Sequence, residues 1–150
     1  MIVNEFGKRG IKLKKELVVI FTVGALLLSG SASAFTAQSS SVRLGSGSKF
    51  SEGAKINGTD SEHVGRLTGK LVVAGGQVSV EAMKQISYWP DSSVDCLIVD
   101  STTKLTKEKV ILEPYDSLYY VKIISYLDSP TATGTLYNYG GNRQATEDKC

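Results

Sequence analysis

Residues 118–139, LYYVKIISYLDSPTATGTLYNY, carry the strongest strand pattern in the chain. From Leu118 the side chains alternate between two sides, and both sides are largely apolar. Successive side chains of a strand point to opposite faces of the sheet, so a strand that is apolar on both is expected at the centre of a covered sheet. We therefore expect Val121, Ile123 and Leu127 to contribute to a hydrophobic core.

The same stretch contains a break and a second strand. Residues 128–130 are Asp-Ser-Pro, and proline fixes φ and lacks an N–H, while Asp and Ser favour turns. Residues 131–139 then alternate β-branched and aromatic side chains, which suit a pleated sheet, until Gly140 and Gly141 end the pattern. The stretch as a whole predicts an antiparallel β-hairpin.

Further strand patterns occur along the chain between turn residues, at residues 42–44, 65–74, 77–86, 94–100 and 107–112. Gly75 and Gly76 can adopt positive φ in a two-residue turn, which predicts a second hairpin between 65–74 and 77–86. Residues 49–63 lack periodicity and are expected to form a loop. The pattern predicts an all-β fold, an antiparallel β-sandwich of six or seven strands, with a small β-barrel as the alternative.

The first 34 residues have the pattern of an export signal. Five Lys and Arg residues precede the 12-residue apolar run 17–28, and residues 32–34, Ala-Ser-Ala, match a signal-peptidase site. The run is shorter than the ~20 apolar residues that a membrane helix needs, so we expect no membrane span in the mature chain. We expect a bacterial signal-peptide helix cleaved near Ala34, followed by one secreted or cell-surface β domain at 35–150; an uncleaved anchor is the alternative.

Removing residues 1–34 changes the charge balance. The whole chain carries +2, but these residues hold five Lys and Arg and two Asp and Glu, which leaves twelve and thirteen in residues 35–150. The net charge of −1 that results gives no support for nucleic-acid binding.

The two cysteines, Cys96 and Cys150, permit one disulfide in an oxidising compartment. Such a bridge closes a long loop and would contribute ~3–4 kcal/mol to stability. The alternative is a buried Cys96 thiol and a free Cys150, because two cysteines carry no spacing signature.

Catalytic patterns are weak. His63 is the single histidine, no G-x-S-x-G surrounds a serine, and a zinc site would lack a second histidine. Carboxylates that could hydrolyse glycosides are present, but they alternate with apolar residues as solvent-facing strand positions do: Glu81, Asp95, Glu108 and Glu113. The oxygen-rich loops 57–62 and 91–95 do not follow the EF-hand order. We expect no enzyme, no metal and no cofactor.

Aromatic residues are the suggestive feature, since all seven tyrosines and the single tryptophan lie between residues 88 and 139. Exposed rings stack on sugars or anchor protein partners. The candidate ligand-binding residues are Tyr88, Trp89, Tyr120, Tyr126, Tyr137 and Tyr139. If they bind a ligand, at least three should share one solvent-accessible face; the alternative is that the rings cover the core with their hydroxyls in water.

The function predicted from the sequence is a small secreted binding module for cell-surface glycan, including cell-wall polymer, or for a surface protein. A secreted toxin or bacteriocin-like protein that acts on another cell's surface is the first alternative. A small hydrolase that uses carboxylates is the second.

Overall fold

The computed structural model of the chain describes residues 35–113, 117–126 and 130–146. Within these residues the protein is all-β, and none of them forms a helix long and apolar enough to cross a membrane. The strands are β1 (Ser39–Leu44), β2 (Phe50–Glu52), β3 (Ile56–Asn57), β4 (Gly65–Leu71), β5 (Val78–Lys84), β6 (Ser92–Val99), β7 (Leu105–Val110), β8 (Leu118–Ser125) and β9 (Ala132–Tyr137). The predicted signal-peptide helix lies outside the described residues.

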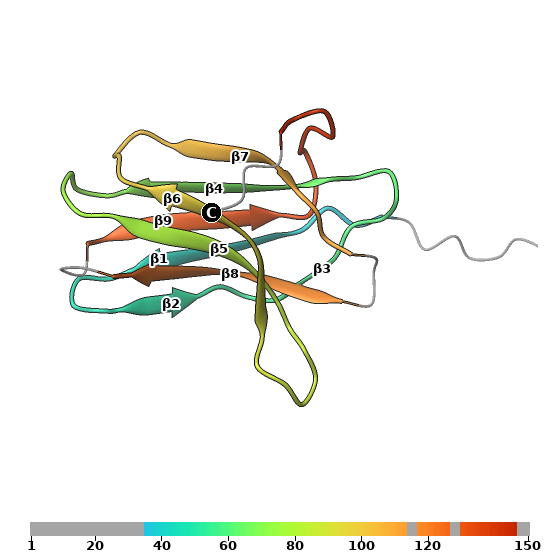
Figure 1. The fold of residues 1–150 in the computed structure, drawn as a ribbon, viewed down its shortest axis with the longest axis horizontal. Helices are drawn as coiled ribbons and strands as arrows, with labels where there is room; N and C mark the ends of the chain where they lie inside the picture. The colour runs from blue at the N-terminus through green and yellow to red at the C-terminus, as the bar shows by residue number, and fades with distance from the viewer. Residues whose placement is uncertain (1–34, 114–116, 127–129, 147–150) are drawn as a thin grey trace, which may run out of the picture. The chain divides into compact units, whose positions relative to one another are not determined.

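The strands form two antiparallel sheets that overlie one another as a sandwich (Figure 1). Sheet A has the order β1-β9-β4-β7, and sheet B has the order β2-β8-β5-β6, with β3 also paired to β8. This order is that of a jelly roll, with β3 as an addition. The predicted antiparallel β-sandwich is therefore confirmed, although the described residues form nine strands instead of the six or seven expected.

The predicted hairpin at residues 118–139 is wrong, although both of its strands exist. β8 pairs with β5 on one side and with β2 and β3 on the other, whereas β9 pairs with β1 and β4. Each strand directs one apolar row into the same core from opposite sheets. Residues consecutive in sequence therefore pack across the core instead of forming hydrogen bonds in one sheet.

The predicted hairpin around Gly75 and Gly76 fails for the same reason, because β4 and β5 belong to different sheets. Both glycines do adopt positive φ, 103° and 93°. The expected loop at residues 49–63 also needs correction, since it contains β2 and β3. The one adjacent pair of strands that forms a hairpin within a sheet of the described chain is β5–β6.

The core lies between the sheets. Val121 and Ile123 of β8 are fully buried in it, as predicted, and Leu127 lies outside the described residues. Gly69 of β4 pairs with Gly134 of β9, and the Val80 side chain fills the space that these glycines leave. A Cβ at Gly134 would lie 2.7 Å from Val80 Cγ1, so the pair of glycines permits close approach of the sheets.

One ion pair lies between the sheets near the edge formed by β6 and β7. Lys107 Nζ lies 2.5 Å from Asp95 Oδ1, and the two side chains are only 9% and 15% exposed. The ammonium group also donates to the Cys96 carbonyl oxygen at 3.3 Å. The solvent-facing position expected for Asp95 is therefore wrong, because Lys107 provides a buried partner.

Candidate functional site

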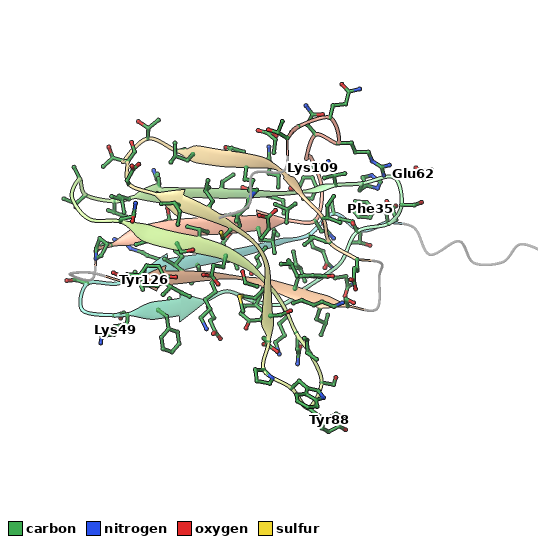
Figure 2. All side chains as sticks on the ribbon, in the orientation of Figure 1. Phe35, Lys49, Glu62, Tyr88, Lys109 and Tyr126 are labelled. Carbon is green, nitrogen blue, oxygen red and sulfur yellow. The ribbon has the colours of Figure 1, made fainter. Side chains whose placement is uncertain are left out.

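The structure separates the six predicted aromatic residues instead of gathering them. Tyr88 and Trp89 lie in the loop between β5 and β6, and Tyr126 follows the end of β8 (Figure 2). Tyr120 lies within β8 and is only 5% exposed. Tyr137 is the last residue of β9 in sheet A and Tyr139 follows that strand, and their rings meet edge to face at 5.6 Å.

The β5–β6 hairpin carries the most exposed rings. The loop of residues 85–91 extends beyond the sheets, and Tyr88 lies at its tip (Figures 1 and 2). Tyr88 is fully exposed, and Trp89 is 75% exposed. Tyr88 also adopts φ of 67°, the left-handed region that non-glycine residues rarely occupy. The tip thus combines backbone strain with two rings that contribute little to the core.

Asp91 fixes the base of this loop. Its Oδ1 accepts the Ile86 N–H at 3.0 Å, and its Oδ2 accepts the Tyr120 hydroxyl at 2.8 Å. The Gln85 N–H donates to the Leu118 carbonyl at 2.8 Å, which extends the pairing of β5 with β8. The loop is therefore held at its base while its tip remains in solvent.

The same hydrogen bonds shift the acidity of both partners. The bond from the Ile86 N–H lowers the pKa of Asp91 most, and the Tyr120 hydroxyl lowers it further. Burial is the largest cause that raises the pKa of Tyr120, followed by its hydrogen bond to Asp91. Asp91 is thus a carboxylate and Tyr120 a neutral donor at neutral pH, which stabilises the base of the hairpin.

The tip itself offers binding rather than proton transfer. Tyr88 supplies a phenol hydroxyl and Trp89 an indole N–H, and each also presents an aromatic face for stacking. The nearby carboxylate of Asp91 already accepts two hydrogen bonds. These groups suit recognition of a ligand that has both apolar faces and hydroxyls.

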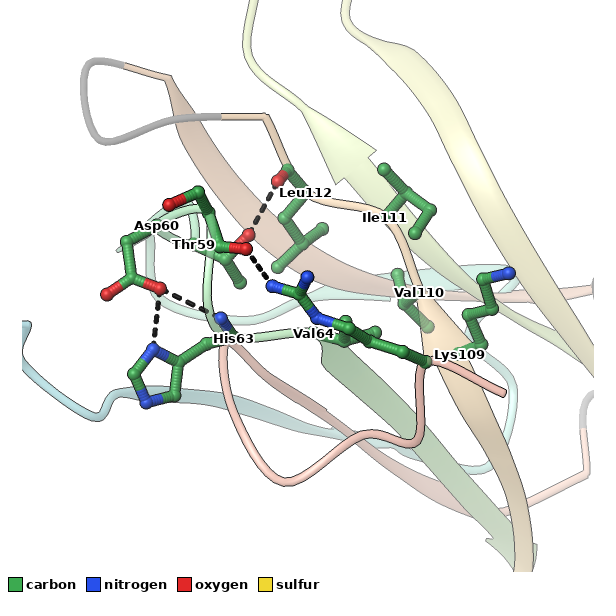
Figure 3. Close-up of a pocket in the computed structure, with 10 residues that line it drawn as sticks. Thr59, Asp60, His63, Val64, Lys109, Val110, Ile111 and Leu112 are labelled. Carbon is green, nitrogen blue, oxygen red and sulfur yellow. Dashed lines mark hydrogen bonds and ion pairs between the residues drawn. The ribbon is translucent and has the colours of Figure 1, made fainter. Parts of the chain in front are cut away.

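A second candidate is a pocket of about 370 Å³ lined by residues of the 59–64 and 109–112 segments and by Arg143 (Figure 3). His63 Nδ1 lies 2.5 Å from Asp60 Oδ1, and Phe35 stacks on the imidazole with centroids 3.8 Å apart. The weak catalytic patterns of the sequence assigned no role to His63. The Asp-x-x-His spacing, with Asp60 accepting the His63 N–H at 2.8 Å, is the local signal that could have indicated the pair.

Among the residues that the structure describes, no nucleophile is positioned against the imidazole in this pocket. Burial raises the pKa of Asp60, but hydrogen bonds from the His63 ring and from the His63 and Glu62 N–H groups lower it more. The Thr59 hydroxyl donates to the Leu112 carbonyl at 2.6 Å, and Arg143 donates to the Ser61 carbonyl. In the described chain no hydroxyl bonds to the His63 ring, so the geometry resembles a structural Asp–His pair more than a catalytic triad.

The carboxylates that the sequence offers for glycoside hydrolysis lie apart from one another. Glu81 lies on sheet B and Glu108 on sheet A, while Glu113 pairs with Lys84. Among the described residues, no group of three or more His, Cys, Asp or Glu is arranged to hold a metal ion. Cys96 is disulfide-bonded, but Cys150 lies outside the described residues, so the pairing of the two stays a prediction.

The chain was compared with protein-family models, curated proteins and solved structures, and none of the three comparisons gave a match. A jelly-roll strand order supports many unrelated functions. The site geometry therefore carries the functional argument alone.

Proposed function

We propose that the protein is a binding module that holds a cell-surface glycan through the aromatic tip of the β5–β6 hairpin. The observation that carries this proposal is the fully exposed Tyr88 at φ of 67°, next to the largely exposed Trp89. Left-handed backbone at a non-glycine residue costs about 1–2 kcal/mol, and neither ring compensates by burial in the core. A ligand that covers the rings supplies the missing stabilisation.

A glycan suits the chemistry of the tip. Sugar rings present C–H faces for stacking and hydroxyls for the Tyr88 and Trp89 donors. The Asp91 hydrogen bonds keep the base of the loop ordered before binding, which lowers the entropy cost of association. The predicted export signal supports a ligand at the cell surface.

The test is binding of residues 35–150 to cell-wall polysaccharide fractions and a glycan array, measured for the native protein and for Trp89→Ala. We expect the variant to bind at least about tenfold more weakly, as is typical of a central aromatic anchor. Tyr126→Ala is the matched control, because it removes a tyrosine that is 67% exposed and lies away from Tyr88 at the hairpin tip (Figure 2). Equal binding by native protein and a folded Trp89→Ala variant would contradict the proposal.

Tyr88→Gly separates the role of the ring from that of the backbone. Glycine adopts positive φ without strain, so this variant should be more stable than Tyr88→Ala by about 1 kcal/mol. Both variants should lose glycan binding if the ring makes the contact.

A toxin that acts on another cell's surface is the second candidate, because tyrosine and tryptophan also favour the membrane–water interface. Leakage from lipid vesicles caused by the native protein and lost in Trp89→Ala would favour this function over glycan binding.

A further inference from the structure

The outer face of sheet A, the side turned away from sheet B, presents a continuous row of hydroxyls. Strand register places Ser41 opposite Thr135, Thr135 opposite Thr68, and Thr68 opposite Thr106. The row thus crosses β1, β9, β4 and β7 in order. Ser41 Oγ and Thr135 Oγ1 lie 3.0 Å apart, which shows that the two side chains point to the same side.

The next row of residues on the same face contains basic side chains. Arg43 lies opposite Thr133, and Thr133 lies opposite Lys70. Lys104 immediately precedes β7, beside Leu105, which pairs with the neighbour of Lys70. All three cations are exposed. Because strands are ~4.8 Å apart, Arg43 and Lys70 are separated by about 10 Å across the sheet.

Basic residues outnumber acidic residues in the strands of sheet A. The four strands of sheet A hold five Lys and Arg residues but a single carboxylate, Glu108. Strand alternation places Arg43, Arg66 and Lys70 on the outer face, whereas Lys107 points between the sheets and pairs with Asp95. The strands of sheet B hold two Lys and three acidic residues. The net charge near zero expected from the sequence therefore hides a cationic sheet, which the fold creates by collecting distant segments.

Three exposed cations of this face have no acidic partner among the described residues, unlike several other cations. Lys84, Lys107 and Lys122 pair with Glu113, Asp95 and Glu52. Arg43, Lys70 and Lys104 make no ion pair within the described parts of the chain. Exposed, unpaired cations that line a hydroxyl row form a surface complementary to an anionic ligand.

A hollow of about 270 Å³ joins the two rows. Its walls include Lys70, Lys104 and Tyr137, and Thr68 belongs to its lining although this residue is only 4% exposed. The Arg66 guanidinium lies 4.4 Å from the centroid of the Tyr137 ring and holds it by a cation–π contact. The hollow therefore has a hydroxyl floor, a cationic side and a fixed aromatic wall.

We infer that this face binds a linear polyol phosphate, a polymer whose repeats carry phosphodiester charges and free hydroxyls. The phosphodiesters would pair with Arg43, Lys70 and Lys104, and the polyol hydroxyls would exchange hydrogen bonds with the row at Thr68 and Thr135. The width of the cationic row, which crosses the sheet, suits a polymer better than a single ion.

Nucleic acid fits this face less well. Proteins that bind single strands on a sheet stack bases on exposed aromatic faces. On this face one side of the Tyr137 ring is already occupied by Arg66, and the positions of the two rows carry hydroxyls or cations. The hydroxyl row instead matches a chain rich in hydroxyls.

The test is titration of residues 35–150 with fluorescent poly(glycerol phosphate) at 50 and 200 mM salt. We expect saturable binding that weakens with salt, and a loss of at least about tenfold in Lys70→Ala/Lys104→Ala. Lys49→Ala/Lys55→Ala is the matched control, because it removes two exposed lysines outside sheet A and should bind as the native protein does. Unchanged binding in Lys70→Ala/Lys104→Ala would overturn the inference.

Three further measurements define the chemistry. Thr135→Val should weaken binding without changing the salt dependence, because it removes a hydroxyl and no charge.

Duplex and single-stranded DNA that bind as tightly as poly(glycerol phosphate) would contradict the inference and indicate a surface that binds any polyanion. Trp89→Ala should bind poly(glycerol phosphate) normally, so failure of the hairpin proposal and failure of this one remain distinguishable.

Discussion

Asp91 is the residue that links backbone, side chain and charge at the candidate site. Its carboxylate holds Ile86 at one side of the loop and Tyr120 on β8, so a single side chain joins the hairpin to the sheet. Tyr88, three residues earlier, has the opposite character, since it is strained and makes no core contact. The contrast between a fixed base and a free tip is the physical reason to regard the loop as a recognition element.

We expect acid to weaken the hydrogen bonds by which Asp91 holds the base of this loop. The pKa of Asp91 is below its ordinary value of 3.8, chiefly because of the Ile86 N–H, so the folded state binds this proton less tightly than the unfolded state does. The stabilisation is thus complete above about pH 4 and is lost as the pH falls through the folded-state pKa. Trp89 fluorescence and exchange of the Ile86 amide should report a transition with its midpoint below 3.8.

Asp91→Asn is the control for this transition. Asparagine keeps an acceptor for the Ile86 N–H but does not titrate, so the acid-dependent change at Ile86 should disappear. The same transition in Asp91→Asn would show that another carboxylate controls the loop.

At the scale of elements, strand existence and strand pairing have different origins. The alternation of β8 and β9 is visible in the sequence, and both strands form where it predicts them. Their partners are not visible, because an inward apolar row has the same pattern whether its neighbour in sequence lies in the same sheet or in the facing one. Lys107 shows the same limit, since a lysine in an alternating strand gives no sign that it will point between the sheets.

Lys107→Met should destabilise the protein by about 3 kcal/mol, because it leaves the Asp95 carboxylate buried without its counter-charge. Lys107→Met/Asp95→Asn should recover part of this loss, since the amide oxygen can still accept the Cys96 N–H that Asp95 accepts at 2.8 Å. Urea unfolding measures both values.

Lys122→Met provides the matched comparison, because Lys122 pairs with Glu52 at 3.0 Å with both side chains partly exposed. Surface pairs contribute about 0–1 kcal/mol, so this variant should lose much less stability. Equal losses for Lys107→Met and Lys122→Met would mean that the pair between the sheets is not effectively buried.

For the whole molecule, the strand order places segments that are far apart in the chain on one surface. Sheet A collects β1, β4, β7 and β9, and sheet B collects the strands between them. The cationic face and the aromatic hairpin therefore lie on different sheets. We expect two separable binding surfaces, which the proposed variants can remove one at a time.

A disulfide from Cys96 to Cys150 would close a loop that contains β7, β8 and β9, strands of both sheets. Reduction, or Cys150→Ser, should then lower the free energy of unfolding by about 3–4 kcal/mol, because the unfolded chain gains conformational entropy. Thiol titration of the denatured, unreduced protein should find no free thiol. Two thiols per chain would contradict the bridge.

The sequence by itself determined the all-β class, most of the strands and core residues such as Val121 and Ile123, because these depend on local alternation and on burial of apolar side chains. It also marked Tyr88 and Trp89 as candidate ligand-binding residues. Only the tertiary structure decided which strands pair, that Tyr120 is covered while Tyr88 is exposed, and that Arg43, Lys70 and Lys104 share one face. The reason is that each of these features depends on strand register and on the connections between two sheets, which bring together residues that no local pattern relates.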